Sequence, residues 1–303
     1  MTGSPADNRV AGDDTPARSY VVGLLGRGLA GSLAAALQEG EARAQGIPLA
    51  YRLLDADRVS LGLADTGDVL RWAATLGFDG LNVTHPFKRA ALTAVDEATT
   101  EARLLGAVNT LTLAGGRSRG HNTDWLGFRD ALRAEIPAAV GADVVVLGAG
   151  GAGVAVAYGA LRAGVARVTL IDSEPGRAEA AAGALAEAVG PDRVDMAGSS
   201  PSDVAAALRG ADGVVQATPV GMAGHPGMPF EPGLLDPAQW LAEIIYFPLE
   251  TALARAVRKR GSAVMTGGAM AVHQHAAAFE VFTGRAADLA RMSAHFATLT
   301  GER

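Results

Sequence analysis

The chain has 303 residues, of which 49% are hydrophobic and 19% charged, a composition that predicts a globular protein with ample core and excludes disorder over most of its length. Its length is about twice the ~150 residues of a typical domain and predicts two domains. The formal net charge of −6 argues against a nucleic-acid partner, and the absence of cysteine excludes disulfides and thiolate metal sites.

Residues 1–18 are polar and rich in Gly, Pro and Asp, so they predict a disordered leader with nothing to bury. They contain no apolar signal core, and no apolar run in the chain approaches the ~20 residues needed to cross a bilayer. We therefore expect a cytoplasmic protein that does not enter a membrane.

Strands alternate with helices in the first half of the chain. The expected elements are strands at 20–26, 50–55 and 80–84 and helices at about 30–45, at about 67–77 and from 86. A hairpin or two short strands over 107–124 then lead into a helix from 124 that bridges the domains. This order predicts an α/β domain over residues 19–123.

The stretch "GLNVTHPFK", residues 80–88, ends in a lysine that does not suit its helix. Pro86 is expected to open that helix, which places Lys88 in the first turn, where the helix dipole disfavours positive charge. A solvated lysine is the simplest interpretation of this residue alone. A functional role requires a partner and a cleft.

The second half repeats short β-branched runs with alanine-rich helical stretches between them. The runs begin at residues 143, 167, 193, 213, 240 and 262, and the expected strands are 143–148, 167–172, 193–198, 213–218, 240–246 and 262–267. Such spacing predicts a doubly wound domain with a parallel sheet over 124–267. The helical sequence 268–303 has no further strand, and we expect it to fold back, complete the first domain and close a cleft.

A glycine-rich turn follows the first strand of the second half. In "VVVLGAGGAG", Gly148 permits a tight turn, Gly150 lets the backbone approach a pyrophosphate, and Gly153 lets helix and strand pack closely. The preceding strand, the following helix and an acidic residue at the end of the next strand, Asp172, strengthen this dinucleotide signature.

Asp172 also bears on the choice of cofactor. A carboxylate at this position accepts hydrogen bonds from the adenosine ribose and repels a 2′-phosphate, which favours NAD over NADP. A turn or cap aspartate is the alternative, and Arg177 could receive a 2′-phosphate.

Several linked motifs resemble the shikimate dehydrogenase family. "GLNVTHPFK", "LGAVNT", "GHNTD", "GAGGAG", "ATPVGM", "IIYFPLET" and "GGAMAVHQ" occur in the family's order and spacing over about residues 20–299. The resemblance is closest to the NAD-dependent quinate/shikimate dehydrogenases and their aminoshikimate-pathway relatives. It implies an N-terminal α/β substrate domain, a Rossmann domain with a parallel sheet, and reversible oxidation of the ring C3 hydroxyl of a cyclic carboxylate.

The resemblance also assigns site residues. Lys88 and Asp124 match the pair that flanks the reacting hydroxyl, and the positions that match substrate-binding residues are Ser32, Asn82, Thr84, Asn109, Tyr246 and Gln274. The cofactor-binding positions are Gly148, Ala149, Gly150, Gly151, Ala152, Gly153, Asp172, Thr218, Met222 and Gly267, while Gln216 stands where the family often has asparagine. No metal ligand is expected.

Hydride removal from an alcohol requires a group that takes the hydroxyl proton, and Lys88 fits this task with Asp124 to orient it. Each residue also has a structural alternative. Asp124 could simply begin a helix, Asn109 could be a turn residue, Gln274 could lie on the surface, and Tyr246 could be a core aromatic.

The first motif departs from the family pattern. The family carries two hydroxyls in an SxS or SxT stretch followed by proline, which hold the substrate carboxylate, but this chain has Ser32, Ala34 and Ala35. A lost hydrogen bond to a carboxylate weakens binding by roughly 1.5–3 kcal/mol. Arg27 is a candidate replacement because a guanidinium can bind a carboxylate in bidentate fashion.

These features predict an NAD-dependent dehydrogenase acting on shikimate, quinate or another small hydroxylated ring carboxylate, as a monomer or homodimer. One alternative is a paralogue for a different acid such as aminoshikimate. Another is a non-catalytic NAD-binding regulatory protein, against which the retention of both Lys88 and Asp124 argues.

Overall fold

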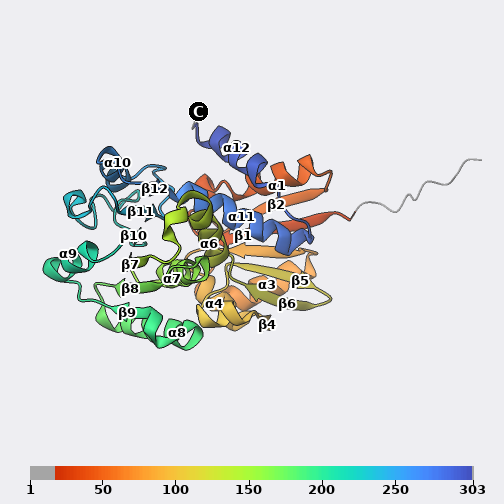
Figure 1. Cartoon of the computed structure of the whole chain (residues 1–303). Coiled ribbons are helices and arrows are strands. Elements are labelled where there is room, and N and C mark those ends of the chain that lie inside the picture. Colours follow the sequence, from red (N-terminus) through yellow and green to blue (C-terminus); the bar gives the residue numbers. More distant parts are fainter. Residues whose placement is uncertain (1–17, 302–303) are drawn as a thin grey trace, which may run out of the picture.

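The computed structural model describes residues 18–301, which form two sheets side by side with helices around and between them (Figure 1). The predicted leader lies outside the described residues except for Arg18, whose guanidinium pairs with Asp79 at 2.9 Å. Within 18–301 no helix has the length and apolar character to cross a membrane.

The first sheet is mixed. Its strand order is β2-β1-β3-β5-β6-β4, formed by β1 (Tyr20–Gly26), β2 (Leu49–Asp55), β3 (Gly80–Val83), β4 (Glu97–Ala98), β5 (Thr110–Ala114) and β6 (Arg117–His121). β1 pairs in parallel with β2 and β3, whereas β5 runs antiparallel to both β3 and β6. The hairpin expected over 107–124 is therefore β5–β6.

Helices cover both faces of this sheet. They are α1 (Ala34–Ala44), α2 (Ala56–Val59), α3 (Thr66–Thr75), α4 (Lys88–Ala94), α5 (Thr100–Leu104), α11 (Gly267–Thr283) and α12 (Leu289–Thr300). Phe87 and Leu81 belong to one core cluster with α3, whereas Phe282 of α11 packs against Val22 and Leu24 of β1. Helix α11 thus lies against the first sheet, and α12 packs on α1 and α11.

The second sheet is entirely parallel, in the order β12-β11-β10-β7-β8-β9. It contains β7 (Asp143–Leu147), β8 (Arg167–Ile171), β9 (Val194–Met196), β10 (Gly213–Gln216), β11 (Trp240–Glu243) and β12 (Val264–Met265). Its helices are α7 (Gly151–Ala163), α8 (Pro175–Val189), α9 (Pro201–Arg209) and α10 (Ala252–Lys259). This order is that of a Rossmann sheet, so the predicted α/β fold class with a doubly wound parallel sheet is confirmed.

Several boundaries differ from the expectation, among them the strands expected over 193–198, 213–218 and 262–267, which are shorter, and two of the differences lie near the cavity. α4 begins at Lys88 with Phe87 as its N-cap, and Pro86 lies in the preceding turn after a cis peptide bond, so the proline does not open the helix. The strand expected over 240–246 ends at Glu243, because the Glu243 carboxylate accepts a hydrogen bond from the Ile245 N–H and turns the chain off the sheet.

Helix α6 (Asp124–Glu135) lies between the two sheets and packs against α7 on one side and α11 on the other (Figure 1). Two glycines permit this close packing. A Cβ at Gly127 would lie 2.6 Å from the backbone nitrogen of Gln274, and one at Gly159 would lie 2.7 Å from the Trp125 carbonyl oxygen. α6 is therefore in tight contact with both halves of the molecule.

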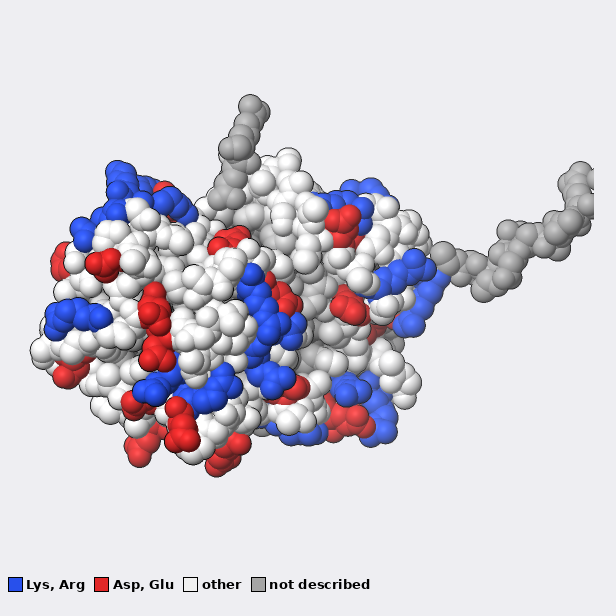
Figure 2. All heavy atoms as spheres, viewed as in Figure 1, with Lys and Arg blue, Asp and Glu red and all other residues white. Residues whose placement is uncertain are grey.

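Figure 2 shows that basic and acidic side chains are interspersed over the face in view, with uncharged surface between them.

Candidate active site

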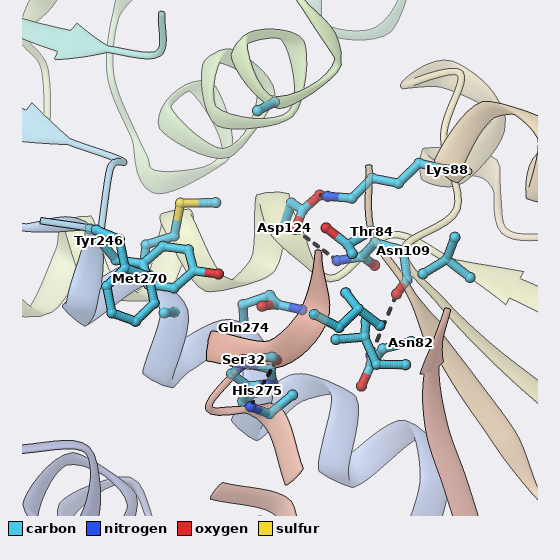
Figure 3. Close-up of a pocket in the computed structure, with 18 of the residues that line it drawn as sticks. Ser32, Asn82, Thr84, Lys88, Asn109, Asp124, Tyr246, Met270, Gln274 and His275 are labelled. Atoms are coloured by element: carbon cyan, nitrogen blue, oxygen red, sulfur yellow. Dashed lines mark hydrogen bonds and ion pairs between the residues drawn. The ribbon is translucent and has the colours of Figure 1, made fainter. Parts of the chain in front are cut away.

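A cavity of about 380 Å³ lies between the two halves, and both contribute to its lining. All predicted proton-transfer and substrate positions lie on its wall (Figure 3): Ser32, Asn82, Thr84, Lys88, Asn109, Asp124, Tyr246 and Gln274. Of the predicted cofactor positions, Ala152 and Gly267 line the same cavity. Residues from α1, β3, α4, α6, α7 and α11 therefore converge on one space.

Lys88 and Asp124 form an ion pair in this cavity. The Lys88 Nζ donates to the Asp124 Oδ2 at 2.6 Å, and the two side chains are 29% and 11% exposed. Lys88 opens α4 and Asp124 opens α6, so two helix starts bring the pair together. The partner and the cleft that a functional lysine requires are both present.

A buried network orients the Asp124 carboxylate. The Asn109 side-chain amide donates to the Asp124 Oδ1 at 2.8 Å and to the Thr123 hydroxyl at 3.0 Å, and the Thr123 N–H donates to the Asn109 Oδ1 at 2.7 Å. Gln274 reaches the same hydroxyl at 3.3 Å. One carboxylate oxygen is thus bound to Asn109, and the other faces Lys88.

Asn82 is also held in place. The Tyr51 hydroxyl donates to its Oδ1 at 2.8 Å, and its Nδ2 donates to the Thr110 hydroxyl at 2.9 Å. Asn82 is 3% exposed, and burial raises the pKa of Tyr51, which keeps the phenol protonated as the donor. The asparagine side chain therefore has a defined orientation at the cavity wall.

Tyr246 lies on the loop after β11. The buried Glu243 anchors that loop, accepting hydrogen bonds from the Ile245 N–H at 3.1 Å and the Thr251 hydroxyl at 3.0 Å. Burial raises the pKa of Glu243 to about 7, against the opposing effect of these hydrogen bonds. Tyr246 and its neighbour Phe247 both line the cavity.

The glycine turn between β7 and α7 has the geometry that a dinucleotide requires. Gly148 adopts φ +97°, which favours glycine, and a Cβ at Gly153 would lie 1.9 Å from the Gly148 carbonyl oxygen. A Cβ at Gly150 would meet no atom within 4 Å, so the backbone there borders open space. The turn lies where the strand order reverses between β7 and β10, the usual nucleotide position in such sheets.

Asp172 follows β8 and has contacts of its own within the protein. Its carboxylate accepts hydrogen bonds from the Ala149 N–H at 2.7 Å and the Glu174 N–H at 2.9 Å, and its side chain is 5% exposed. The Arg177 guanidinium lies 3.5 Å from Asp172 and 2.5 Å from Glu174. Asp172 thus supports the glycine turn as well as standing at the strand end.

The remaining predicted cofactor residues do not line the cavity, and they follow the carboxyl ends of β7, β8 and β10 instead. They are Gly148, Ala149, Gly150, Gly151, Gly153, Asp172, Thr218 and Met222. The Thr218 hydroxyl donates to the buried Gln216 at 2.9 Å, and Met222 is 40% exposed. Their cofactor role stays a prediction.

The Ser32 end of the cavity contains the departure from the family motif. The Ser32 hydroxyl accepts a hydrogen bond from the Ala34 N–H at 3.3 Å. The Arg27 guanidinium lines the cavity but donates to Asp57 at 2.6 Å and to the Leu61 carbonyl at 2.8 Å. Arg27 is therefore already engaged by contacts within its own domain.

Comparison with known proteins agrees with this geometry. Residues 24–111 match the family model for the shikimate dehydrogenase substrate binding domain. The chain is 48% identical over 283 residues to a shikimate dehydrogenase (NADP(+)) of Streptomyces avermitilis, covering 93% of this chain and 97% of the relative. The chain belongs to the shikimate dehydrogenase family. It is accordingly an NAD(P)-dependent oxidoreductase of the shikimate/quinate dehydrogenase type.

Other members of the shikimate dehydrogenase family differ in the cofactor they use. A quinate/shikimate dehydrogenase (NAD(+)) of Corynebacterium efficiens is 40% identical, with 93% of this chain and 99% of the relative covered. The solved structure of quinate dehydrogenase from Corynebacterium glutamicum in complex with NAD has a TM-score of 0.86 at 39% identity and covers 92% of this chain and 99% of that one. Relatives of both cofactor types are thus similar to this chain.

Some cavity residues of this shikimate dehydrogenase family member are absent from the sequence-based set, namely Arg27's neighbours Gly28, Leu29 and Gly31 together with Ile244, Phe247, Met270, Ala271 and His275. His275 is the one member of this set with an ionisable side chain. Its Nδ1 is buried and has no hydrogen-bond partner among residues 18–301. Burial lowers the pKa of His275 to about 4, and the Asp124 charge opposes this effect. The sequence signal for His275 is its position directly after Gln274 in the motif "GGAMAVHQ".

Proposed function

We propose that this protein is an NAD-dependent dehydrogenase that interconverts shikimate with 3-dehydroshikimate, quinate with 3-dehydroquinate, or both, at the ring C3 hydroxyl. The observation that carries the proposal is the 2.6 Å contact between Lys88 and Asp124 in the cavity that also receives the start of α7. A proton-transfer pair and a dinucleotide turn at one cavity are what alcohol oxidation requires.

The proposed role of Lys88 is proton transfer. During oxidation its Nζ, in the neutral amine form, takes the proton of the C3 hydroxyl, and during reduction the ammonium returns a proton to the same oxygen. Asp124 holds the amine in position and is itself oriented by Asn109 at 2.8 Å. The nicotinamide cofactor, when bound, supplies the hydride acceptor or donor.

The other cavity residues position the ring acid. Asn82, Thr84 and Gln274 present polar groups to the space, and Tyr246 covers it from the opposite domain. We propose a substrate domain of residues 19–123 completed by 268–303 and a Rossmann domain of 124–267, because α11 packs on the first sheet and α12 packs on α1 and α11.

The preference for NAD over NADP rests on charge. The carboxylates of Asp172 and Glu174 lie beside Arg177, at 3.5 Å and 2.5 Å, and they neutralise the cation that a 2′-phosphate would need. A 2′-phosphate at this strand end would meet two negative charges and one positive charge. The adenosine ribose of NAD brings no charge to the same place.

The test is a matrix of shikimate, quinate and aminoshikimate against NAD and NADP, followed by the absorbance of the reduced cofactor. We expect turnover of shikimate or quinate with a higher kcat/KM for NAD. Faster turnover with NADP would contradict the cofactor preference. NAD binding without turnover of any ring acid would instead favour the non-catalytic alternative, and turnover of aminoshikimate alone would favour the paralogue.

A further inference from the structure

The polar wall of the cavity contains one group without an assigned role, the imidazole of His275 on α11. Its Nδ1 is buried and has no hydrogen-bond partner within the described chain. Buried polar groups are almost always paired, because an unpaired one costs free energy comparable to a lost hydrogen bond. Contacts inside the protein therefore do not explain why a polar ring occupies this position.

The backbone at His275 is tied to helix α1 by a side-chain hydrogen bond. The buried Gln38 of α1 donates from its Nε2 to the His275 carbonyl oxygen at 2.8 Å. This contact ties α11 to the helix that begins at Ala34. Figure 3 shows the His275 ring next to Ser32, with Gln274 between these two residues and Asp124.

Electrostatics decides which end of the cavity suits a substrate carboxylate. At the Asp124 end of the cavity the Lys88 charge is already compensated by Asp124 at 2.6 Å, so this end offers no free cation to a second carboxylate. The Ser32 and His275 side has no acidic lining residue and offers a hydroxyl and an imidazole. The acid group of the ring therefore fits best at this side, with the C3 hydroxyl directed toward Lys88.

Besides Ser32, the side-chain donors at this side of the cavity are those of Gln274 and His275, and the Gln274 amide already donates to the Thr123 hydroxyl at 3.3 Å. Ala34 has no polar side-chain atom, and the Arg27 guanidinium is bound to Asp57 at 2.6 Å and to the Leu61 carbonyl at 2.8 Å. Ser32 alone provides one hydroxyl. A carboxylate has two oxygens, which together accept several hydrogen bonds.

We propose that His275 is a substrate-binding residue whose Nε2, the ring nitrogen that is not buried, donates a hydrogen bond to the carboxylate of the ring acid, beside the Ser32 hydroxyl. It takes the place of the side-chain hydroxyl that Ala34 lacks. The inference rests on the proposed function, since it assumes that the substrate is a ring acid. It makes His275 a determinant of specificity for acids over uncharged rings.

The experiment compares shikimate with its uncharged carboxamide in the full-length enzyme. For His275→Ala and for His275→Leu, which keeps side-chain volume, we expect KM for shikimate to rise roughly ten- to a hundredfold, with kcat changed little. KM for the carboxamide should change much less, because the lost interaction is with the charged group. His273→Ala is the matched control, since His273 lies on the same helix and does not line the cavity.

A rescue variant separates a binding role from a packing role. Adding Ala34→Ser to His275→Ala returns a hydroxyl to α1, and we expect it to recover most of the lost affinity for shikimate. Equal rises of KM for acid and carboxamide, or an unchanged KM for shikimate, would overturn the proposal for His275 while leaving the proposed function intact. A wild-type enzyme that turns over no ring acid would overturn both.

Discussion

Lys88 is the first residue of α4, where a positive charge does not help the helix, and its amine is instead bound to Asp124 at 2.6 Å. Its position is thus explained by the cavity. General acid–base groups contribute about 10²- to 10⁴-fold to rate. We therefore expect Lys88→Ala to lower kcat at least about a hundredfold while NAD binding, measured by calorimetry, stays near the wild-type value.

Arg89 provides the control for that variant. It is the next basic residue on α4, it is exposed, and it does not line the cavity, so Arg89→Ala should retain turnover. Near-normal turnover in Lys88→Ala would remove the lysine from the chemistry.

Asp172 supports the glycine turn through the Ala149 N–H, and its proposed second task, the choice of cofactor, can be tested by a substitution. Asp172→Asn keeps the size of the side chain and removes its charge, which should raise the ratio of kcat/KM for NADP to that for NAD by about tenfold, or about 1.4 kcal/mol. The exposed Asp195 of β9 is the control, and Asp195→Asn should leave the ratio unchanged. Selectivity that is the same in both variants and the wild type would show that Asp172 serves only the glycine turn.

At the level of elements, the contact between α6 and α11 determines where Gln274 lies. A Cβ at Gly127 would lie 2.6 Å from the Gln274 nitrogen and Cβ, so Gly127→Ala must push the two helices apart. We expect a loss of about 1–3 kcal/mol in the free energy of unfolding and a lower kcat/KM. Denaturant unfolding and steady-state kinetics measure the two effects.

Gly183 is a matched control within another helix. It lies inside α8, and a Cβ there would meet no atom within 4 Å. Gly183→Ala should be neutral or stabilising by up to about 1 kcal/mol because alanine is the better helix former. A similar loss in both variants would argue against close helix packing as the cause.

The sequence predicts the strands of the second sheet well, because buried parallel strands such as β7 and β8 are continuous apolar runs that stand out from the helices. Their ends are less predictable. β11 stops at Glu243 because a side-chain hydrogen bond to the Ile245 N–H turns the chain, and residue patterns do not contain that contact. The antiparallel pairing of β5 with β3 likewise depends on tertiary packing.

The site could be predicted where motifs mark it, as for Lys88, Asn109 and Asp124, which lie within one hydrogen-bonded group. The positions of His275 and Met270 at the cavity could not be predicted in this way. α11 is rich in alanine and apolar around most of its circumference, so periodicity does not reveal which side faces the cavity until the helix has packed against α6.

At the scale of the whole molecule, α12 joins the end of the chain to α1 through Glu41 and Arg291. The Arg291 guanidinium donates to both carboxylate oxygens, at 2.7 Å and 2.8 Å, and the Glu41 side chain is fully buried. Burial raises the pKa of Glu41, but hydrogen bonds from Arg291, the Asp288 N–H and Gln45 outweigh this and lower it to about 2.

A carboxyl group with a lowered pKa contributes stability above its ordinary pKa of 4.5 and loses it as the pH falls toward about 2. Arg291→Leu should therefore lower Tm at pH 7, with a difference from the wild type that shrinks below about pH 4.5. Arg285→Leu changes an exposed arginine nearby and should leave Tm nearly unchanged. A difference that is constant from pH 7 to pH 3 would contradict the role of this ion pair.

The position of α6 between the two halves determines where a change in the angle between them would act. Both halves of the molecule pack closely on this one helix, α11 at Gly127 and α7 through Gly159. The first residue of the helix is Asp124. If the angle between the two halves changes, the rotation axis therefore lies close to α6, the helix that carries the Asp124 carboxylate. The Lys88–Asp124 contact at 2.6 Å therefore lies at the junction of the two halves rather than at their far ends.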